Sequence, residues 1–392
     1  MNFLSAISTI KIWIGKSVFQ TALLVFLCLL VCIQAFFQDE LANFFIFTTS
    51  SQRFMEGKNL YEFIQYGIIW DKFFYSPSFA VMFIPFTLLP LKLAVPLWIL
   101  MGAMIFRYAL NTLPLSNPQK TILFFIVLID LINSMQNLQT NALCAALSIL
   151  IFSGLHNGKI KVAALCTALC FCIKIYPAAP ALLFLFYPQK LKFLTWSLVF
   201  FILLFALPFL FSDSAYVISC FKNWFTTLIE DTNPAAVCNA PSFIGINYAW
   251  FPHPIRHVWI QIAGLTLLFA PLTKLFFQKA NLPFLLRYFA FILISIILFN
   301  HAAESPGYIF VASGCGIWYA LSNKSHWDNA LLIFLFVGCI LLPTDLYPST
   351  LRKEYFEPLK IRTFPAIIIW GLLLRDLLRK SNLQPTQQVS YE

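Results

Sequence analysis

The sequence predicts an all-α protein that crosses a lipid bilayer many times. Three observations indicate this fold class: 60% of the 392 residues are hydrophobic, only 11% are charged, and the mean hydropathy is +0.79. A soluble globular protein of this size does not need so much apolar surface. We therefore expect a single membrane domain over residues 1–380, with roughly eleven spans or half-spans. A polar, disordered cytoplasmic tail is expected at 381–392.

The charge and the cysteines exclude other classes of protein. The net charge of +10 would suit nucleic acid, but the Lys and Arg residues fall in short loops between apolar runs. Such loops mark the cytoplasmic face of a membrane protein, so we expect no nucleic-acid partner. Most of the ten cysteines lie in apolar runs without zinc-like spacing, and we expect no metal and no cofactor. Only Cys220 and Cys238 fall clearly outside the spans, and they are predicted to lie close enough to form a disulfide.

The first apolar run, at 17–37, is expected to be an uncleaved span with the N-terminus in the cytoplasm. It follows Lys11 and Lys16, exceeds a signal-peptide core in length, and lacks a small-x-small cleavage site. The stretch 38–76 is then outside. Its apolar residues recur at helical spacing over 41–55, which predicts a helix lying in the interface, with a turn at Gly57.

Two adjacent acids, Asp39 and Glu40, stand between the first span and this interfacial helix. One interpretation is that they cap the helix, because acids are favoured in a first turn. The other is that they form an acidic site at the membrane surface. The local pattern alone favours the cap.

Two later stretches have two possible topologies. Prolines interrupt 77–110, which is either two spans or a re-entrant half-helix followed by one span. The run 162–186 either crosses or turns back near 174–177. We prefer the re-entrant version of both, because it leaves every basic loop on the cytoplasmic side. Further spans are expected at 121–135, 142–154, 193–211, 258–277, 282–299, 306–321, 330–342 and 364–378, with an outer polar loop at 212–254 whose Trp224, Trp250 and Phe251 suit the interface.

Several polar residues interrupt the apolar runs, where each ionisable group costs a few kcal/mol and is a functional candidate. Asp130 and Lys174 lie within runs, and His301 and Glu304 lie between two of them. An amide cluster follows the aspartate: Asn133, Gln136, Asn137, Gln139 and Asn141. The structural alternatives are a buried ion pair between Asp130 and Lys174, hydrogen bonds between helices through the amides, and a satisfied interfacial histidine.

Under the preferred topology these groups share one depth on the outer side. We therefore expect Asp130, Lys174, Gln139 and His301 to line one outward-facing cavity, with the helix 41–55 over it. Their chemistry suits transfer from a phosphate-linked donor. A lysine would hold the phosphate, an acid or histidine would take the acceptor proton, and amides would orient a sugar.

Five segments together resemble a known family. They are the aromatic segment from Asn43 that ends in Gly57-Lys-Asn-Leu-Tyr61, Tyr75-Ser-Pro-Ser-Phe79, Leu138-Gln-Thr-Asn141, Lys174-Ile-Tyr-Pro177 and Asn300-His-Ala-Ala-Glu-Ser-Pro306. In this order the chain resembles glycosyltransferase family 87, membrane-embedded GT-C enzymes that include polyprenyl-phosphate-mannose-dependent mannosyltransferases.

The resemblance implies a GT-C-like bundle and an inverting hexosyltransferase of the cytoplasmic membrane. A hexose, mannose by family analogy, would pass from a polyprenyl-phosphate donor to a lipid or glycan acceptor on the outer face. The base would be an acid of the first outer loop, Asp39 or else Glu40, with His301 as partner or base. The expected donor- and substrate-binding residues are Lys174, Asn43, Tyr75, Asp130, Gln139, Asn141, Glu304 and Ser305.

Two positions depart from the family pattern. Asn43 stands where the family acid is expected, and Leu138 replaces the glycine of Gly-Gln-x-Asn. Either Asp39 or Glu40 supplies the base, or the protein has lost transfer activity and binds or flips a lipid-linked glycan. An ion-coupled transporter would show matching broken spans in two halves, and the sequence has no such symmetry.

Overall fold

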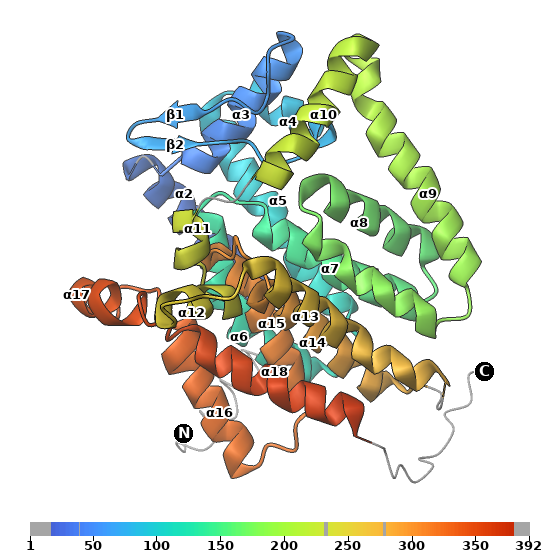
Figure 1. Ribbon diagram of the computed structural model, residues 1–392, viewed down its shortest axis with the longest axis vertical. Coiled ribbons are helices and arrows are strands. Elements are labelled where there is room, and N and C mark those ends of the chain that lie inside the picture. Colours follow the sequence, from blue (N-terminus) through green and yellow to red (C-terminus); the bar gives the residue numbers. More distant parts are fainter. Residues whose placement is uncertain (1–16, 39, 231–233, 277–279, 380–392) are drawn as a thin grey trace.

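The computed structural model describes residues 17–38, 40–230, 234–276 and 280–379, and within them the chain is a bundle of helices (Figure 1). Five helical segments in these ranges are long and apolar enough to cross a membrane: Ser17–Phe37, Leu91–Thr112, Asn117–Gln136, Lys190–Leu210 and His257–Leu275. Shorter apolar helices accompany them. The predicted all-α polytopic fold class is therefore confirmed. The expected tail at 381–392 lies outside the described residues.

The helices follow the expected spans closely, and η marks short 3₁₀ or π-helical segments. In chain order they are α2 (Ser17–Phe37), α3 (Ala42–Met55), α4 (Pro77–Leu88), α5 (Leu91–Thr112), α6 (Asn117–Gln136), α7 (Asn141–His156), α8 (Ile160–Ile173), η1 (Tyr176–Phe186), α9 (Lys190–Ala206), η2 (Leu207–Leu210), α10 (Ser214–Glu230), α11 (Pro234–Asn239), α12 (Phe243–Trp250), α13 (His257–Phe269), η3 (Ala270–Phe276), α14 (Leu282–Leu298), η4 (Ser305–Gly307), α15 (Tyr308–Leu321), α16 (His326–Leu335), η5 (Phe336–Ile340), α17 (Ser349–Leu351), η6 (Arg352–Phe356) and α18 (Thr363–Leu378).

One small β-hairpin, which the sequence did not lead us to expect, projects beside α3 (Figure 1). Strand β1 (Ile64–Tyr66) pairs antiparallel with β2 (Ile69–Asp71). The connection is two residues long and begins at Gly67, whose φ of +57° is a left-handed conformation that glycine adopts without steric cost.

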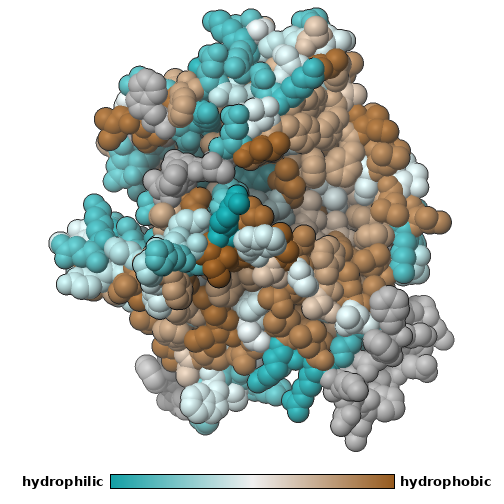
Figure 2. Space-filling view, in the orientation of Figure 1, coloured by the Kyte–Doolittle hydropathy of each residue, from teal (hydrophilic) through white to brown (hydrophobic). Residues whose placement is uncertain are grey.

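The core of the bundle is formed by α7, α14 and α15, whose side chains are buried nearly all round. Helices α14 and α15 pack closely because α15 carries a glycine at their contact. A Cβ atom on Gly314 would lie 2.6 Å from the Cγ1 of Ile294 and 2.7 Å from the carbonyl oxygen of Ala290. Outside this core, α9 exposes a row of large apolar side chains, among them Leu194, Leu198 and Ile202. Figure 2 shows hydrophobic surface on the side where α9 runs, as a lipid-facing helix requires.

The basic loops gather at one end of the bundle, which we call the basic end. Here Arg107, near the end of α5, donates to Ser17 at the start of α2. The side-chain amide of Gln119 at the start of α6 reaches the carbonyl of Ala320 at the end of α15. The opposite end, where Gln136 at the end of α6 donates to Gln34 near the end of α2, is called the amide end.

The helices of the two ambiguous stretches are consistent with the re-entrant form, which stays a prediction. The 12 residues of α4 extend about 18 Å, too short to cross a bilayer, and the long helix α5 follows at once. Helix α8 ends at Ile173, and Lys174 is extended (φ −142°, ψ 135°) before η1 begins. The rings of His156 and Tyr187 lie 6.3 Å apart, so the α8–η1 hairpin starts and finishes at the basic end.

Three expectations about 212–254 are wrong. The stretch is not a loop, because α10, α11 and α12 occupy most of it. Cys220 and Cys238 are free thiols and form no disulfide. The reason is the face that α10 buries: Cys220 and Trp224, one helical turn apart, both point into the protein. The indole of Trp224 is 1% exposed and donates to the carbonyl oxygen of Phe74, so it does not lie at an outer interface, although Trp250 and Phe251 are exposed.

Candidate active site

A chain of hydrogen bonds at the amide end joins four of the predicted substrate-binding residues. The Nζ of Lys174 donates to the Oδ1 of Asn141 over 3.0 Å, and the Nδ2 of Asn141 donates to the Oε1 of Gln139. The Nε2 of Gln139 donates in turn to the Oε2 of Glu304 over 2.7 Å. This set, which we call the lysine–amide chain, connects the α8–η1 break, the α6–α7 turn and the loop before α15.

The α6–α7 turn positions the two amides through a Schellman motif. The N–H of Leu138 donates to the carbonyl of Met135, and the N–H of Gln139 donates to the carbonyl of Ser134. Leu138 has a φ of +50°, the left-handed conformation that favours glycine. Leucine replaces the glycine of the Gly-Gln-x-Asn pattern here, but the backbone keeps the left-handed conformation that a glycine would adopt. The carbonyl of Leu138 is held by the indole N–H of Trp98 over 3.0 Å.

The ammonium of Lys174 bonds to a neutral side chain, the amide of Asn141. Besides Asn141, it lies 5.9 Å from the centre of the Tyr75 ring, whose hydroxyl accepts a hydrogen bond from Thr140. Burial raises the pKa of the Tyr75 phenol, so this hydroxyl stays protonated at neutral pH. No ion pair between Lys174 and a carboxylate occurs among the described residues. The charge of the lysine is thus available to an anion.

A second cluster surrounds Asp130. The Nη2 of Arg362 lies 2.6 Å from its Oδ1, and both side chains are buried. The same guanidinium donates to the Oγ of Ser305 over 2.6 Å and lies 3.9 Å from the centre of the Tyr308 ring. Asn133 also donates to the Oγ of Ser305 over 3.0 Å. Because Ser305 follows Glu304, this cluster holds the loop that completes the lysine–amide chain.

The alternative of a buried ion pair was right for Asp130, but the partner named for it was wrong. Lys174 takes no part in the pair, and Arg362 was not singled out in the sequence. The signal that points to Arg362 is indirect: a carboxylate within an apolar run needs a cation, and Arg362 directly precedes the last apolar run.

The turn between α2 and α3 lies against the end of α6. Gln34 accepts from the amide of Gln136 over 2.6 Å, and the Nδ2 of Asn43 donates to the backbone carbonyl of Asn137 over 2.9 Å. Asp39 lies outside the described residues. Glu40 is exposed and does not cap α3, whose N-cap residue is Leu41 and has no side-chain capping bond.

The comparison with known families agrees with this geometry. The model of glycosyltransferase family 87 matches residues 73–298, more than half of the chain. The chain belongs to glycosyltransferase family 87. No curated protein matches it. With its apolar helices, the protein is a multi-pass membrane glycosyltransferase. The matched stretch includes Lys174, Asn141, Gln139, Asp130 and Tyr75.

Among the predicted site residues of this family 87 protein that lie outside the matched stretch, His301 and Glu304 face different partners. Glu304 joins the lysine–amide chain. The Nδ1 of His301 instead lies 2.9 Å from the Nε2 of Gln261, and its ring is 5.5 Å from that of His257. Both partners belong to α13 and were not singled out in the sequence. The structure thus directs His301 toward α13, whereas it directs Glu304 toward Lys174.

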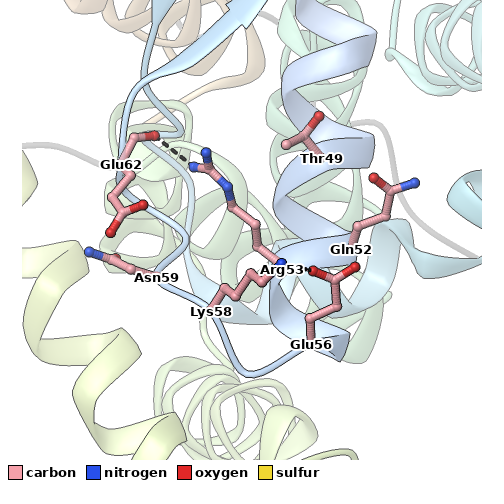
Figure 3. A pocket seen from close by; sticks show the side chains of 7 residues that line it. All are labelled: Thr49, Gln52, Arg53, Glu56, Lys58, Asn59 and Glu62. Carbon is pink, nitrogen blue, oxygen red and sulfur yellow. Dashed lines mark hydrogen bonds and ion pairs between the residues drawn. The ribbon is translucent and has the colours of Figure 1, made fainter.

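A polar hollow of about 400 Å³ opens at the far end of α3 in this glycosyltransferase (Figure 3). Arg53 reaches across it to the carbonyl of Glu62 over 2.8 Å, and Lys58 pairs with Glu56 over 2.7 Å. The lysine–amide chain does not line this hollow. The common cavity predicted for Asp130, Lys174, Gln139 and His301 therefore stays a prediction.

Proposed function

We propose that this glycosyltransferase transfers a hexose, mannose by family analogy, from a polyprenyl-phosphate donor to a lipid or glycan acceptor. The transfer occurs with inversion on the outer face of the cytoplasmic membrane, within a GT-C-like fold. The observation that carries the proposal is the lysine–amide chain. Within the part of the chain that the structure describes, it places an ammonium that forms no ion pair next to two carboxamides and an exposed carboxylate, Glu304.

In this proposal Lys174 holds the donor phosphate. A compact ammonium follows negative charge as it develops on the departing phosphate, and an amide oxygen keeps this lysine oriented before the donor arrives. Gln139 and Asn141 offer both donors and acceptors, which suits the hydroxyl groups of a hexose. Tyr75, Glu304 and Ser305 surround the same place, and Asp130 acts on it through Arg362 and Ser305.

The base is assigned to Asp39, with Glu40 as its substitute. Gln34 and Asn43 flank these acids in sequence and both bond to the end of α6, which supports a location near the amide end. In an inverting transfer the base removes the acceptor hydroxyl proton while that oxygen attacks the anomeric carbon and the bond to phosphate breaks. His301 orients the acceptor, or is itself the base if the acids face away.

The proposal that the site faces outward rests on the basic loops, which lie at the opposite end of the bundle. Positive loops favour the cytoplasm, which leaves the amide end outside. Two variants that each introduce one cysteine at an exposed position test this orientation. Lys58→Cys is at the far end of α3, and Asn323→Cys is at the basic end. A membrane-impermeant maleimide applied to intact cells should label only the first. Labelling of only the second would reverse the orientation.

A second candidate function is supported by Asn43. Where the family acid is expected, this chain has a carboxamide that already donates to the carbonyl of Asn137 and has no basic oxygen for proton transfer. A protein that only binds or flips a lipid-linked glycan would keep Lys174 and the amides without needing a base.

One assay distinguishes the two candidates. Purified protein is incubated with a set of radiolabelled polyprenyl-phosphate hexoses, with lipid and glycan acceptors, and both transfer and hydrolysis are measured. Turnover of any donor supports the enzyme, and preference for the mannose donor supports the assigned sugar. Tight binding of every donor without transfer or hydrolysis would replace the enzyme with the binding protein.

A further inference from the structure

A second hollow, of about 330 Å³, lies at the basic end, on the opposite side of the bundle from the lysine–amide chain. Four elements meet there: the start of α14, the end of α15, the start of α16 and the end of α18. Arg287, Trp318, Asp328 and Arg375 contribute charged and aromatic groups to its lining, and Leu331 and Leu372 contribute apolar ones. The proposed sugar transfer uses none of these residues.

Arg287 is the cation of this hollow that remains available. It is half-buried, and among the described residues its guanidinium makes no hydrogen bond and no ion pair. Arg375, by contrast, is already neutralised, because its Nη2 lies 2.8 Å from the carboxylate of the neighbouring Asp376. A guanidinium in a partly desolvated hollow is well suited to a phosphate, which it can bind through two parallel hydrogen bonds.

The acids of the hollow argue against a purely anionic ligand. Asp328 lies in the first turn of α16, where its Oδ2 accepts from the backbone N–H of Ser325. Together with Asp376 it balances the two arginines of the lining, so the hollow carries no net positive charge. A ligand that combines a phosphate with a nearby primary ammonium would satisfy both signs.

The depth of the charged groups matches a lipid headgroup. Arg287 is the sixth residue of α14 counted from the basic end, about 8 Å along the helix, whereas Asp328 is in the first turn of α16. Trp327, beside the aspartate, is 81% exposed, as is common for a tryptophan at a membrane interface. Further along, Ile333 of α16 and Val337 of η5 are exposed and offer an apolar surface to acyl chains.

We propose that this hollow binds the headgroup of a zwitterionic phospholipid that carries a primary amine, a phosphatidylethanolamine. The phosphate pairs with Arg287, the ammonium pairs with Asp328, and the acyl chains run along the exposed apolar side of α16. The site serves as a structural lipid site that ties α14 and α15 to α16 and α18 at the basic end.

The test measures lipid binding to the detergent-purified full-length protein by native mass spectrometry. Phosphatidylethanolamine, phosphatidylcholine and phosphatidylglycerol of the same acyl composition are titrated separately. Phosphatidylethanolamine should bind best, because only its headgroup presents both a phosphate and ammonium N–H donors. Arg287→Ala should weaken its binding by about tenfold or more, as expected for the loss of a charge-assisted bond. Equal affinity for the three lipids, or an unchanged Arg287→Ala, would overturn the proposal.

Two further variants make the result specific. Asp328→Asn keeps an oxygen for the Ser325 N–H and removes the charge, so it should lower phosphatidylethanolamine affinity to that for phosphatidylcholine. Arg379→Ala removes an exposed arginine at the same end that does not line the hollow, and it should leave phosphatidylethanolamine affinity unchanged.

Soluble glycerophosphoethanolamine should bind far more weakly than the lipid. Equal binding would mean a water-soluble ligand and contradict the lipid site. The unfolding temperature of each variant without lipid shows whether it is folded, and Arg287→Gln replaces Arg287→Ala if the latter is not.

Discussion

Arg362 donates a 2.6 Å hydrogen bond to Asp130 across 232 positions of sequence, and only 7% and 1% of the two side chains are exposed. The pair connects the segment before α18 to α6. Through Ser305, it also connects both to the loop that carries Glu304. This buried charge pair therefore helps to hold the lysine–amide chain in place. Its loss should also lower the stability of the protein.

Breaking this pair on one side should destabilise the protein strongly. Asp130→Leu or Arg362→Met leaves one buried charge without its partner, and we expect each to lower the free energy of unfolding by about 3–5 kcal/mol. The double variant Asp130→Leu with Arg362→Met removes both charges and should recover most of the loss. Denaturation in detergent measures all three. A double variant as unstable as the sum of the single ones would show that the pair is not coupled.

Lys174→Ala should weaken donor binding before it affects any other step. The loss of a charge-assisted contact to phosphate corresponds to roughly tenfold to a hundredfold in affinity. Equilibrium binding of a polyprenyl-phosphate hexose measures the effect. Lys161→Ala is the matched control, because this exposed lysine lies in the first turn of α8, at the opposite end of that helix from Lys174. Equal losses in both variants would remove Lys174 from the donor site.

Asp39→Asn should abolish turnover while leaving donor binding nearly intact. Loss of a catalytic base costs a factor of about 10² to 10⁴ in rate. Glu40→Gln should have a smaller effect, since Glu40 is the substitute and not the assigned base. Single-turnover rates at saturating donor measure the chemical step. If both variants keep near-normal turnover and His301→Ala loses it, the histidine carries the chemistry.

Gly314→Ala should destabilise the core, whereas Gly102→Ala should not. The added methyl group at Gly314 would lie 2.7 Å from a backbone oxygen of α14, which forces the α14 and α15 backbones apart. We expect a cost of about 1–3 kcal/mol. A Cβ at Gly102, within α5, meets nothing within 4 Å, so the better helix propensity of alanine should dominate there. Unfolding temperatures in detergent compare the two, and equal shifts would contradict this account of the α14–α15 contact.

Leu138→Gly should destabilise the α6–α7 turn although glycine suits its backbone. Relief of the left-handed conformation returns about 1–2 kcal/mol. The lost side chain, which is 1% exposed, costs about 2–5 kcal/mol, as large-to-small core substitutions do. The net loss should appear as a lower unfolding temperature with the lysine–amide chain intact. A stabilised variant would mean that the leucine side chain contributes little to the packing.

Local patterns in the sequence were enough for most of the apolar helices and for the break at Lys174. Hydropathy located α2 at Ser17–Phe37, because burial in lipid demands an unbroken apolar helix that can be read residue by residue. The interruption before Pro177 was equally local, because proline lacks the backbone N–H that a helix needs. The bias of basic residues in loops favoured the re-entrant form of 77–110 and 162–186.

Contacts between distant segments were decided only by the tertiary structure. Which cation meets Asp130 depends on where the segment before α18 lies against α6, and no local pattern reports a partner 232 positions away. The run 212–254 resembled a polar loop because its helices bury only one face, so the burial of Trp224 required knowledge of what α10 packs against. The direction of His301 likewise follows from the docking of α13, since a side chain turns toward whichever polar partner the packed helices bring within hydrogen-bonding distance.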